Sequence, residues 1–179
     1  MSNLEEEIKS IITPEITTES VAKRYLKRLS DGNYTRDENL ASHYCVYFLP
    51  YNKRTKQIFL GHHKKSGLWL SPGGHIDKGE KLMDVLSREI YEELGIENKA
   101  KEQMKPFLLT ITPIINQVVG PCKEHFDIWY RIPTDGSDFN VDPAEFHATR
   151  WLTIDEARKI VIDKSNLEAL DKMEDFFKS

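Results

Sequence analysis

Three glutamates with helical spacing are the residues of this chain best suited to chemistry. Glu89, Glu92 and Glu93 stand at i, i+3 and i+4, which places them on one face of a helix with 3.6 residues per turn. Like charges at this spacing destabilise a helix by roughly a few tenths of a kcal/mol per pair unless a counter-charge is present. A divalent cation supplies that charge, and oxygen ligands suit Mg²⁺ or Mn²⁺. Because Mg²⁺ commonly completes its coordination with substrate phosphates, the cluster predicts a polyphosphate substrate.

A glycine loop and an amphipathic helix must position these carboxylates. Gly73 and Gly74 follow Pro72, so the backbone there has few steric limits and can come close to a metal or a phosphate. Residues 82–94 predict a helix that buries one side and carries the acids on the opposite side. Gly95 stands where a helix commonly ends in a left-handed conformation. The apolar residues of the buried side are Leu82, Val85, Leu86, Ile90 and Leu94.

The stretch from residue 74 to residue 96 resembles the Nudix box, the signature of the Nudix hydrolase family. Gly74 is followed after five residues by Glu80, and after seven more by the run Arg88-Glu89-Ile90-Tyr91-Glu92-Glu93-Leu94-Gly95-Ile96. Ile90 and Ile96 fill the apolar positions of the box, and no defined position departs from it.

The resemblance implies which residues bind the metal. Glu89, Glu92 and Glu93 would hold Mg²⁺ or Mn²⁺, helped by a backbone carbonyl of Gly73 or Gly74. The implied reaction is hydrolysis by metal-activated water of a phosphoanhydride bond in a nucleoside diphosphate linked to another group, X. The chain would therefore be a metal-dependent pyrophosphohydrolase.

The resemblance also implies supporting roles. Arg88 and Glu80 would pair and orient the cluster, and Glu145, in a loop before a Trp-containing strand, would approach the metals as a further ligand or as a general base. Glu89 is the other candidate base, because a ligand and a base cannot be told apart within one cluster. An exposed loop acid is the alternative for Glu145.

The residues just before the glycine loop are candidates for binding substrate. His63, Lys64 and Lys65 form a basic patch that would contact phosphates or would be only a surface turn. Trp69 would stack a base, although a Trp in a strand before the glycines favours a core position. His62 and His63 are adjacent in a predicted strand and cannot easily reach one metal, which argues against a zinc site there.

Composition indicates one soluble globular domain. The 179 residues are 39% hydrophobic and 30% charged, with a net charge of −4, which argues against non-specific nucleic-acid binding. No apolar run is long enough to span a membrane, and the acidic N-terminus differs from a signal peptide, so we expect a cytoplasmic protein. Cys45 lies in an apolar strand pattern, and neither it nor Cys122 has a CxxC partner, so we assign neither any chemistry.

We expect the chain to divide into an N-terminal helical extension, residues 1–40, and a domain of the Nudix type, residues 41–179. Helices are predicted at 3–12 and 17–30, where they would pack on the domain, cover the site, or form the contact of a homodimer. Within the domain we predict strands at 42–49, 57–63, 107–115 and 125–132, and helices at 82–94, from Thr153, and at 165–178. The predicted fold class is α/β, a Nudix-type α/β/α sandwich with a central mixed β-sheet.

Two rival functions remain at this point. A Nudix-like isomerase of isoprenoid diphosphate needs a catalytic cysteine and extra metal-binding histidines, for which Cys45 and Cys122 offer no supporting context. A non-catalytic module that binds a nucleotide metabolite, as a sensor or scaffold, is expected to carry a decayed box, whereas this box is intact. We favour hydrolysis, with a small nucleoside triphosphate-like substrate because the chain is compact.

Overall fold

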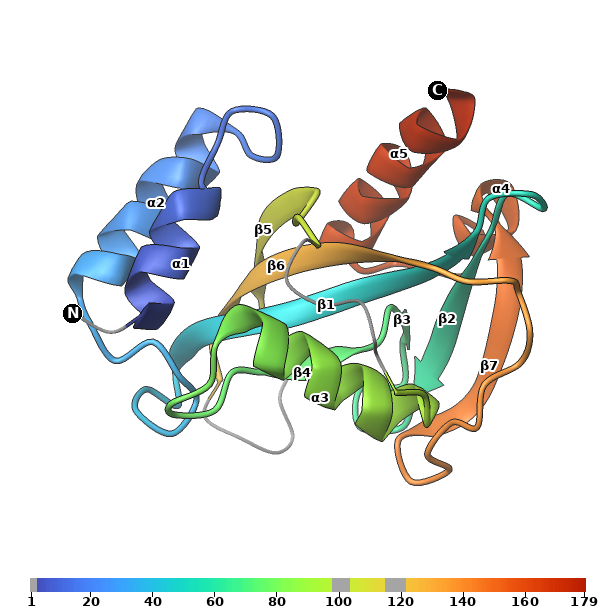
Figure 1. The fold of residues 1–179 in the computed structure, drawn as a ribbon, viewed down its shortest axis with the longest axis horizontal. Coiled ribbons are helices and arrows are strands. Elements are labelled where there is room, and N and C mark those ends of the chain that lie inside the picture. The colour runs from blue at the N-terminus through green and yellow to red at the C-terminus, as the bar shows by residue number, and fades with distance from the viewer. Residues whose placement is uncertain (1–2, 98–103, 115–121) are drawn as a thin grey trace.

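The computed structural model describes residues 3–97, 104–114 and 122–179. Within them, helices cover a sheet of seven strands (Figure 1). The helices are α1 (Asn3–Ile11), α2 (Glu19–Ser30), α3 (Leu82–Leu94), α4 (Ile154–Ala157) and α5 (Lys164–Lys178). The strands are β1 (Ser42–Asn52), β2 (Gln57–His63), β3 (Trp69–Leu70), β4 (Gly73–His75), β5 (Leu108–Pro113), β6 (Glu124–Pro133) and β7 (Phe146–Thr153).

The sheet is mixed, as predicted. Its order is β3-β2-β1-β6-β5, with β4 paired to β1 and β7 paired to β2. β1 and β6 run parallel, with His43 opposite His125, and the other pairs are antiparallel. The predicted hairpin of residues 42–49 and 57–63 is confirmed by β1 and β2. The predicted strand 107–115 is present as β5, although Ile115 lies outside the described residues.

Each face of the sheet carries its own core. Val46 and Phe48 of β1 pack in one cluster with residues of α1, α2 and α3. Leu49, the next residue of the strand, packs in a second cluster with residues of α4 and α5. Successive strand residues point to opposite faces, so helices cover both sides of the sheet, and the predicted α/β/α sandwich is confirmed. No helix in the described part of the chain combines the length and apolar character needed to cross a bilayer.

The N-terminal helices pack on the domain. Leu4 and Ile8 of α1 and Tyr25 and Leu29 of α2 are buried in the same cluster as α3. The Tyr25 hydroxyl lies 2.7 Å from the carbonyl oxygen of Asp127, which belongs to β6. Of the three roles predicted for residues 1–40, packing on the domain is the one these contacts support.

The first helix also supports the start of α3. The backbone N–H of Leu82, the first residue of α3, donates to Oε2 of Glu7 at 2.9 Å. The N–H of Lys81 donates to Oδ2 of Asp84 at 3.3 Å. N–H groups at a helix N-terminus have no partner within the helix, and a negative charge there is favourable. Glu7 therefore acts as a cap supplied by a distant part of the chain.

We expect Glu7→Ala to lower the free energy of unfolding by about 0.5–2 kcal/mol, the usual cost of losing a helix cap. Glu6→Ala is the matched control, because Glu6 is the exposed neighbour on the same helix. Urea unfolding followed by circular dichroism measures both variants. Equal stability of the two variants would contradict the capping role.

Candidate active site

Helix α3 carries the site and has the predicted bounds, Leu82–Leu94. Its predicted apolar side is buried as expected: Leu82, Val85, Leu86, Ile90 and Leu94. Gly95 ends the helix with φ +65°, in the left-handed conformation predicted for it.

The position of the acids differs from the prediction. Glu92 is exposed, but Glu89 and Glu93 are only 6% and 7% exposed, so the acids do not all lie opposite the apolar side. The glycine loop is the reason, because it lies directly against them. A Cβ atom added at Gly74 would lie 2.0 Å from Oε1 of Glu89, and the N–H of Gly73 donates to Oε2 of Glu93 at 2.9 Å.

Gly73 also needs its lack of a side chain. A Cβ atom there would lie 2.3 Å from the carbonyl oxygen of Val46, on the neighbouring strand, and the residue has φ +153°. The glycine backbone was predicted to come close to other groups, and in the structure these groups are strand β1 and the carboxylates of α3. A metal-binding carbonyl at Gly73 or Gly74 stays a prediction.

Arg88 links the loop to the helix. It donates to both oxygens of Glu80, at 2.7 and 2.9 Å, to Oε1 of Glu89 at 2.6 Å and to Oε2 of Glu92 at 3.1 Å. Its remaining donor reaches the carbonyl oxygen of His75 at 2.9 Å. A guanidinium group has five N–H donors, and each has an acceptor here. This geometry is the one expected of the pairing and orienting role predicted for Arg88 and Glu80.

The electrostatics of the cluster favour an added cation. Burial raises the pKa of Glu89 to about 7, although the Arg88 guanidinium acts in the opposite direction. Burial, and then the neighbouring charge of Glu89, raise the pKa of Glu93 well above its ordinary value. Among the described residues, the Arg88 guanidinium is thus the cation hydrogen-bonded to Glu89 and to the neighbouring Glu92, with Lys65 a weaker influence on Glu93. Hard oxygen donors short of positive charge fit a divalent ion of the Mg²⁺ type.

Glu145 lies on the loop that faces this cluster. The N–H of Asp142 in this loop donates to the backbone carbonyl oxygen of Glu93 at 3.4 Å, and the negative charge of Glu145 contributes, after burial and the charge of Glu89, to the raised pKa of Glu93. Lys65 Nζ lies 3.2 Å from both Glu145 oxygens, and His63 Nε2 lies 3.5 Å from one of them. Lys64 Nζ donates instead to the carbonyl oxygen of Pro143. The structure therefore brings the predicted basic patch and the predicted loop acid together.

Trp69 has both core and surface contacts. It is half-buried and packs against the cluster formed with α4 and α5. Its ring stacks on His62 with centroids 5.2 Å apart, and the guanidinium carbon of Arg150 lies 5.0 Å from its centroid. Arg150 was not selected from the sequence, because a single arginine in a strand gives no local signal of the residue it faces.

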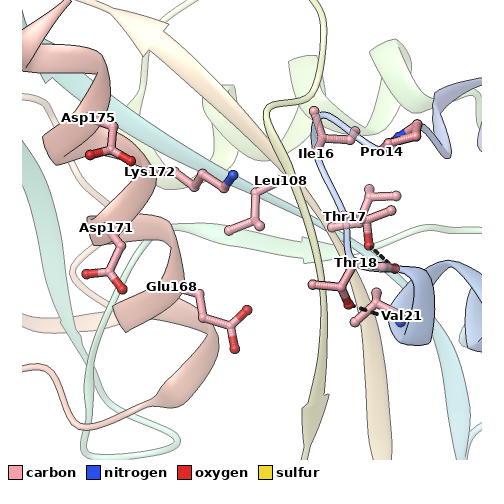
Figure 2. A pocket seen from close by; sticks show the side chains of 11 residues that line it. Pro14, Ile16, Thr17, Thr18, Val21, Leu108, Glu168, Asp171, Lys172 and Asp175 are labelled. Carbon is pink, nitrogen blue, oxygen red and sulfur yellow. Dashed lines mark hydrogen bonds between the residues drawn. The ribbon is translucent and has the colours of Figure 1, made fainter.

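A cavity elsewhere in the molecule does not belong to this site. It has a volume of about 350 Å³ and lies between the segment after α1, strand β5 and helix α5. Figure 2 shows Glu168, Asp171 and Asp175 of α5 on one side of it, together with Lys172. Among the residues that the structure describes, those lining it include none from the glycine loop or α3. Its acidic wall is unfavourable for a polyphosphate.

A model of the NUDIX domain matches residues 41–173 of the chain. The chain belongs to the Nudix family. This Nudix hydrolase is 29% identical over 150 residues to an RNA pyrophosphohydrolase of Azorhizobium caulinodans, covering 72% of this chain and 88% of that protein. It is 27% identical to an m7GpppN-mRNA hydrolase of Danio rerio over 52% of this chain, but spans only 34% of that longer protein.

The fold comparison agrees with the family. The E. coli dihydroneopterin triphosphate pyrophosphohydrolase superposes on the Nudix hydrolase with a TM-score of 0.62 and 18% identity, covering 79% of this chain and 97% of that one. Nudix enzymes generally use divalent metal ions, which agrees with the oxygen-rich cluster on α3. The predicted family, α/β fold and hydrolase class are confirmed.

We expect Arg88→Ala in this Nudix hydrolase to lower both activity and stability. Removing the guanidinium leaves the buried carboxylate of Glu89 and the carboxylate of Glu80 without their main donor, which costs about 1–3 kcal/mol of unfolding free energy. Arg158→Ala is the control, since Arg158 pairs with two acids, Asp171 and Glu174, near the surface and outside the site. Urea unfolding and turnover are measured on both. A folded, fully active Arg88→Ala protein would exclude the orienting role.

Proposed function

We propose that this Nudix hydrolase cleaves a phosphoanhydride bond in a nucleoside triphosphate, or in a similar nucleoside diphosphate linked to X. The observation that carries the proposal is the burial of Glu89 and Glu93 against the glycine loop, with Arg88 bonded to the neighbouring acids. The negative charges of Glu89 and Glu93 repel each other. Such an arrangement suits a function that brings positive charge to the two carboxylates. A site for a polyphosphate and its divalent cation meets that requirement.

Glu89, Glu92 and Glu93 are the residues that would hold the ion, with a carbonyl of Gly73 or Gly74. We favour Mg²⁺ or Mn²⁺, because the donors are all oxygen. When bound, the ion neutralises charge on the reacting phosphates and lowers the pKa of the attacking water. The protein's own contribution is to fix the carboxylates through Arg88 and Gly73 before the substrate arrives.

Glu89 and Glu145 remain the two candidates for the base that takes a proton from the attacking water. They differ in their surroundings. Glu89 is nearly buried and accepts a hydrogen bond from Arg88, whereas Glu145 is half-buried in a loop and pairs with the exposed Lys65. A general base has to be within hydrogen-bond reach of the proton that it takes. The loop position of Glu145 allows it to approach a bound substrate from outside the helix.

His63, Lys64 and Lys65 are proposed to bind the phosphates. Lys65 is the most informative of them, because its ammonium group already lies beside Glu145 and its side chain is 76% exposed. A substrate phosphate that reaches the loop would pair with the Lys65 ammonium group, either in place of Glu145 or beside it. Trp69 stays a candidate for stacking a base, and it would have to share its ring with His62 and Arg150.

We expect Lys65→Ala to raise KM for a nucleoside triphosphate several-fold while changing kcat less. The reason is that a surface ammonium group contributes to binding of the phosphates in the ground state and in the transition state alike. Lys23→Ala is the control, because the Lys23 side chain is 74% exposed and also pairs with an acid, Glu19. Steady-state kinetics at constant ionic strength measure both. An unchanged KM in Lys65→Ala would remove Lys65 from the substrate site.

A second candidate substrate is the 5′ end of an RNA. It is favoured by the similarity to a protein named RNA pyrophosphohydrolase, which extends over 88% of that protein. The net charge of −4 opposes tight non-specific binding of the RNA backbone, so recognition would be limited to the phosphorylated end. We therefore expect nucleoside triphosphates to be cleaved at least as well as an RNA that ends in a 5′-triphosphate.

A turnover panel tests the proposal and separates these substrates. The purified full chain is given nucleoside triphosphates, dinucleoside polyphosphates, nucleotide sugars, ADP-ribose and a 5′-triphosphorylated RNA oligonucleotide, each with and without Mg²⁺ or Mn²⁺. Release of phosphate or pyrophosphate that requires the metal supports the hydrolase and identifies its substrate class. Binding of a nucleotide without turnover on any member would favour the sensor or scaffold alternative.

In the same assay we expect Glu93→Gln to lower kcat by at least about a hundredfold with the fold intact. The change removes a hard ligand and the transition-state stabilisation that depends on it, and it leaves the apolar core untouched. Glu97→Gln is the control, because Glu97 is an exposed acid just beyond the end of α3. Near-normal turnover by Glu93→Gln would refute the assignment of the site.

A further inference from the structure

A second group of metal-ligating side chains lies outside the carboxylate cluster. His43 of β1, His75 of β4, His125 of β6 and Cys122 just before β6 each offer a ligand atom, and these atoms all lie within 4.8 Å of one another. The ring centroids of the three histidines are 4.8, 4.9 and 5.1 Å apart. Four donors of nitrogen and sulfur thus converge from three segments of the chain, around residues 43, 75 and 122–125.

His125 is the observation that points to a ligand. Its side chain is buried, with the residue 8% exposed, and neither ring nitrogen has a hydrogen-bond partner among the described residues. Leaving a buried polar group unsatisfied costs about 1–3 kcal/mol, so such a group in a folded protein calls for an explanation. A bound cation would supply the missing partner.

His43 is oriented in the way expected of a metal ligand. Its Nδ1 lies 2.9 Å from the carbonyl oxygen of Asn39, so the N–H of the neutral ring is on Nδ1 and Nε2 carries the lone pair. That Nε2 lies 3.9 Å from Sγ of Cys122. A carbonyl that fixes the tautomer of a ligating histidine is a common feature of metal sites.

We propose that His43, His75, His125 and Cys122 bind a transition-metal ion of the Zn²⁺ class. Zn²⁺ takes imidazole nitrogen and thiolate sulfur in tetrahedral sites, with bonds of about 2.0–2.3 Å. Such bonds place the donor atoms about 3.3–3.6 Å apart, so the group, now within 4.8 Å, has to contract by an ångström or so. Side-chain rotations of the half-buried His75 and Cys122 provide that movement.

Charge supports the same conclusion. Burial lowers the pKa of His43, that of His75 to about 3 and that of His125 to about 4. All three rings are therefore neutral near pH 7, the form that binds a metal. The four proposed ligands include no carboxylate, so the set differs in kind from the cluster on α3, and soft donors select against Mg²⁺.

A competing ligand group shares His125 with Cys45 and Asp127. We place it second for two reasons. Asp127 is already held through Oδ2, which accepts hydrogen bonds from Thr110 and Thr112, although its Oδ1 has no partner among the described residues. Complete burial raises the pKa of the Cys45 thiol well above its ordinary value, which disfavours the thiolate that a metal needs.

Zn²⁺ binding by the full chain tests the proposal. The protein is stripped with a chelator and titrated with Zn²⁺ in excess Mg²⁺, so that the carboxylates of α3 are occupied by the hard ion. We expect about one tightly held Zn²⁺ per chain, and with Co²⁺ a thiolate-to-cobalt charge-transfer band in the near ultraviolet. Cys122→Ser should abolish the band and weaken binding by at least about tenfold.

Two control variants make the outcome decisive. His147→Gln changes an exposed histidine outside the group and should bind as the wild type does. Cys45→Ser should keep the band; if it loses the band while Cys122→Ser keeps it, the proposed ligand set is wrong. Equal Zn²⁺ affinity in Cys122→Ser and wild type would also overturn the proposal. Should Cys122→Ser fail to fold by circular dichroism, His75→Gln provides the same comparison through a half-buried ligand.

Discussion

The candidate active site depends on the hydrogen bonds of Arg88, whose guanidinium group has an acceptor for each of its N–H donors. Arg88 stands on α3, yet its partners include the carbonyl oxygen of His75 on β4 and the carboxylate of Glu80 in the segment between them. It also holds Glu89, whose burial would be unfavourable without a nearby positive charge. Lysine could not replace it, because an ammonium group lacks the planar fork that holds Glu80 by two bonds.

Support for α3 extends into the N-terminal helices. Glu7 accepts a hydrogen bond from the first N–H of α3, and Glu5 accepts one from the hydroxyl of Tyr34 at 2.6 Å. Ile8 is fully buried in the cluster that also contains the apolar side of α3. The helix that presents the carboxylates is thus held at its start by the extension and along its length by the loop. Rigid support of this kind is what a preorganised site requires.

The local features of the site were predicted correctly from the sequence, but the burial of its carboxylates was not. The bounds of α3 and the left-handed Gly95 follow from residue type and spacing, which act over a few residues. The burial of Glu89 and Glu93 could not be predicted in this way, because periodicity gives the direction of a side chain but not what covers it. The cover is the glycine loop, which touches α3 only because β4 pairs with β1.

The histidine and cysteine group was hidden for the same reason. Its members come from three separate segments of the chain, with only Cys122 and His125 close in sequence, so no complete spacing motif marks them, and Cys122 was assigned no chemistry from the sequence. The parallel register of β1 and β6 sets His43 opposite His125, and the pairing of β4 with β1 brings His75 beside them. Such registers are fixed by the packing of the whole sheet rather than by any local pattern.

The short strand β4 connects the two groups of ligands. A side chain at Gly74 would point at Glu89, and successive residues of a strand point to opposite faces, so His75 faces away from the carboxylates. The carboxylate of Glu89 thus lies on one side of this strand, and the imidazole of His75, with the other proposed nitrogen and sulfur ligands, lies on the other. Because hard and soft donors differ in the ions they prefer, the two sides can hold different metals without competing for one. An ion held by His75 would also stiffen the backbone next to Gly74, the residue whose position sets the burial of Glu89.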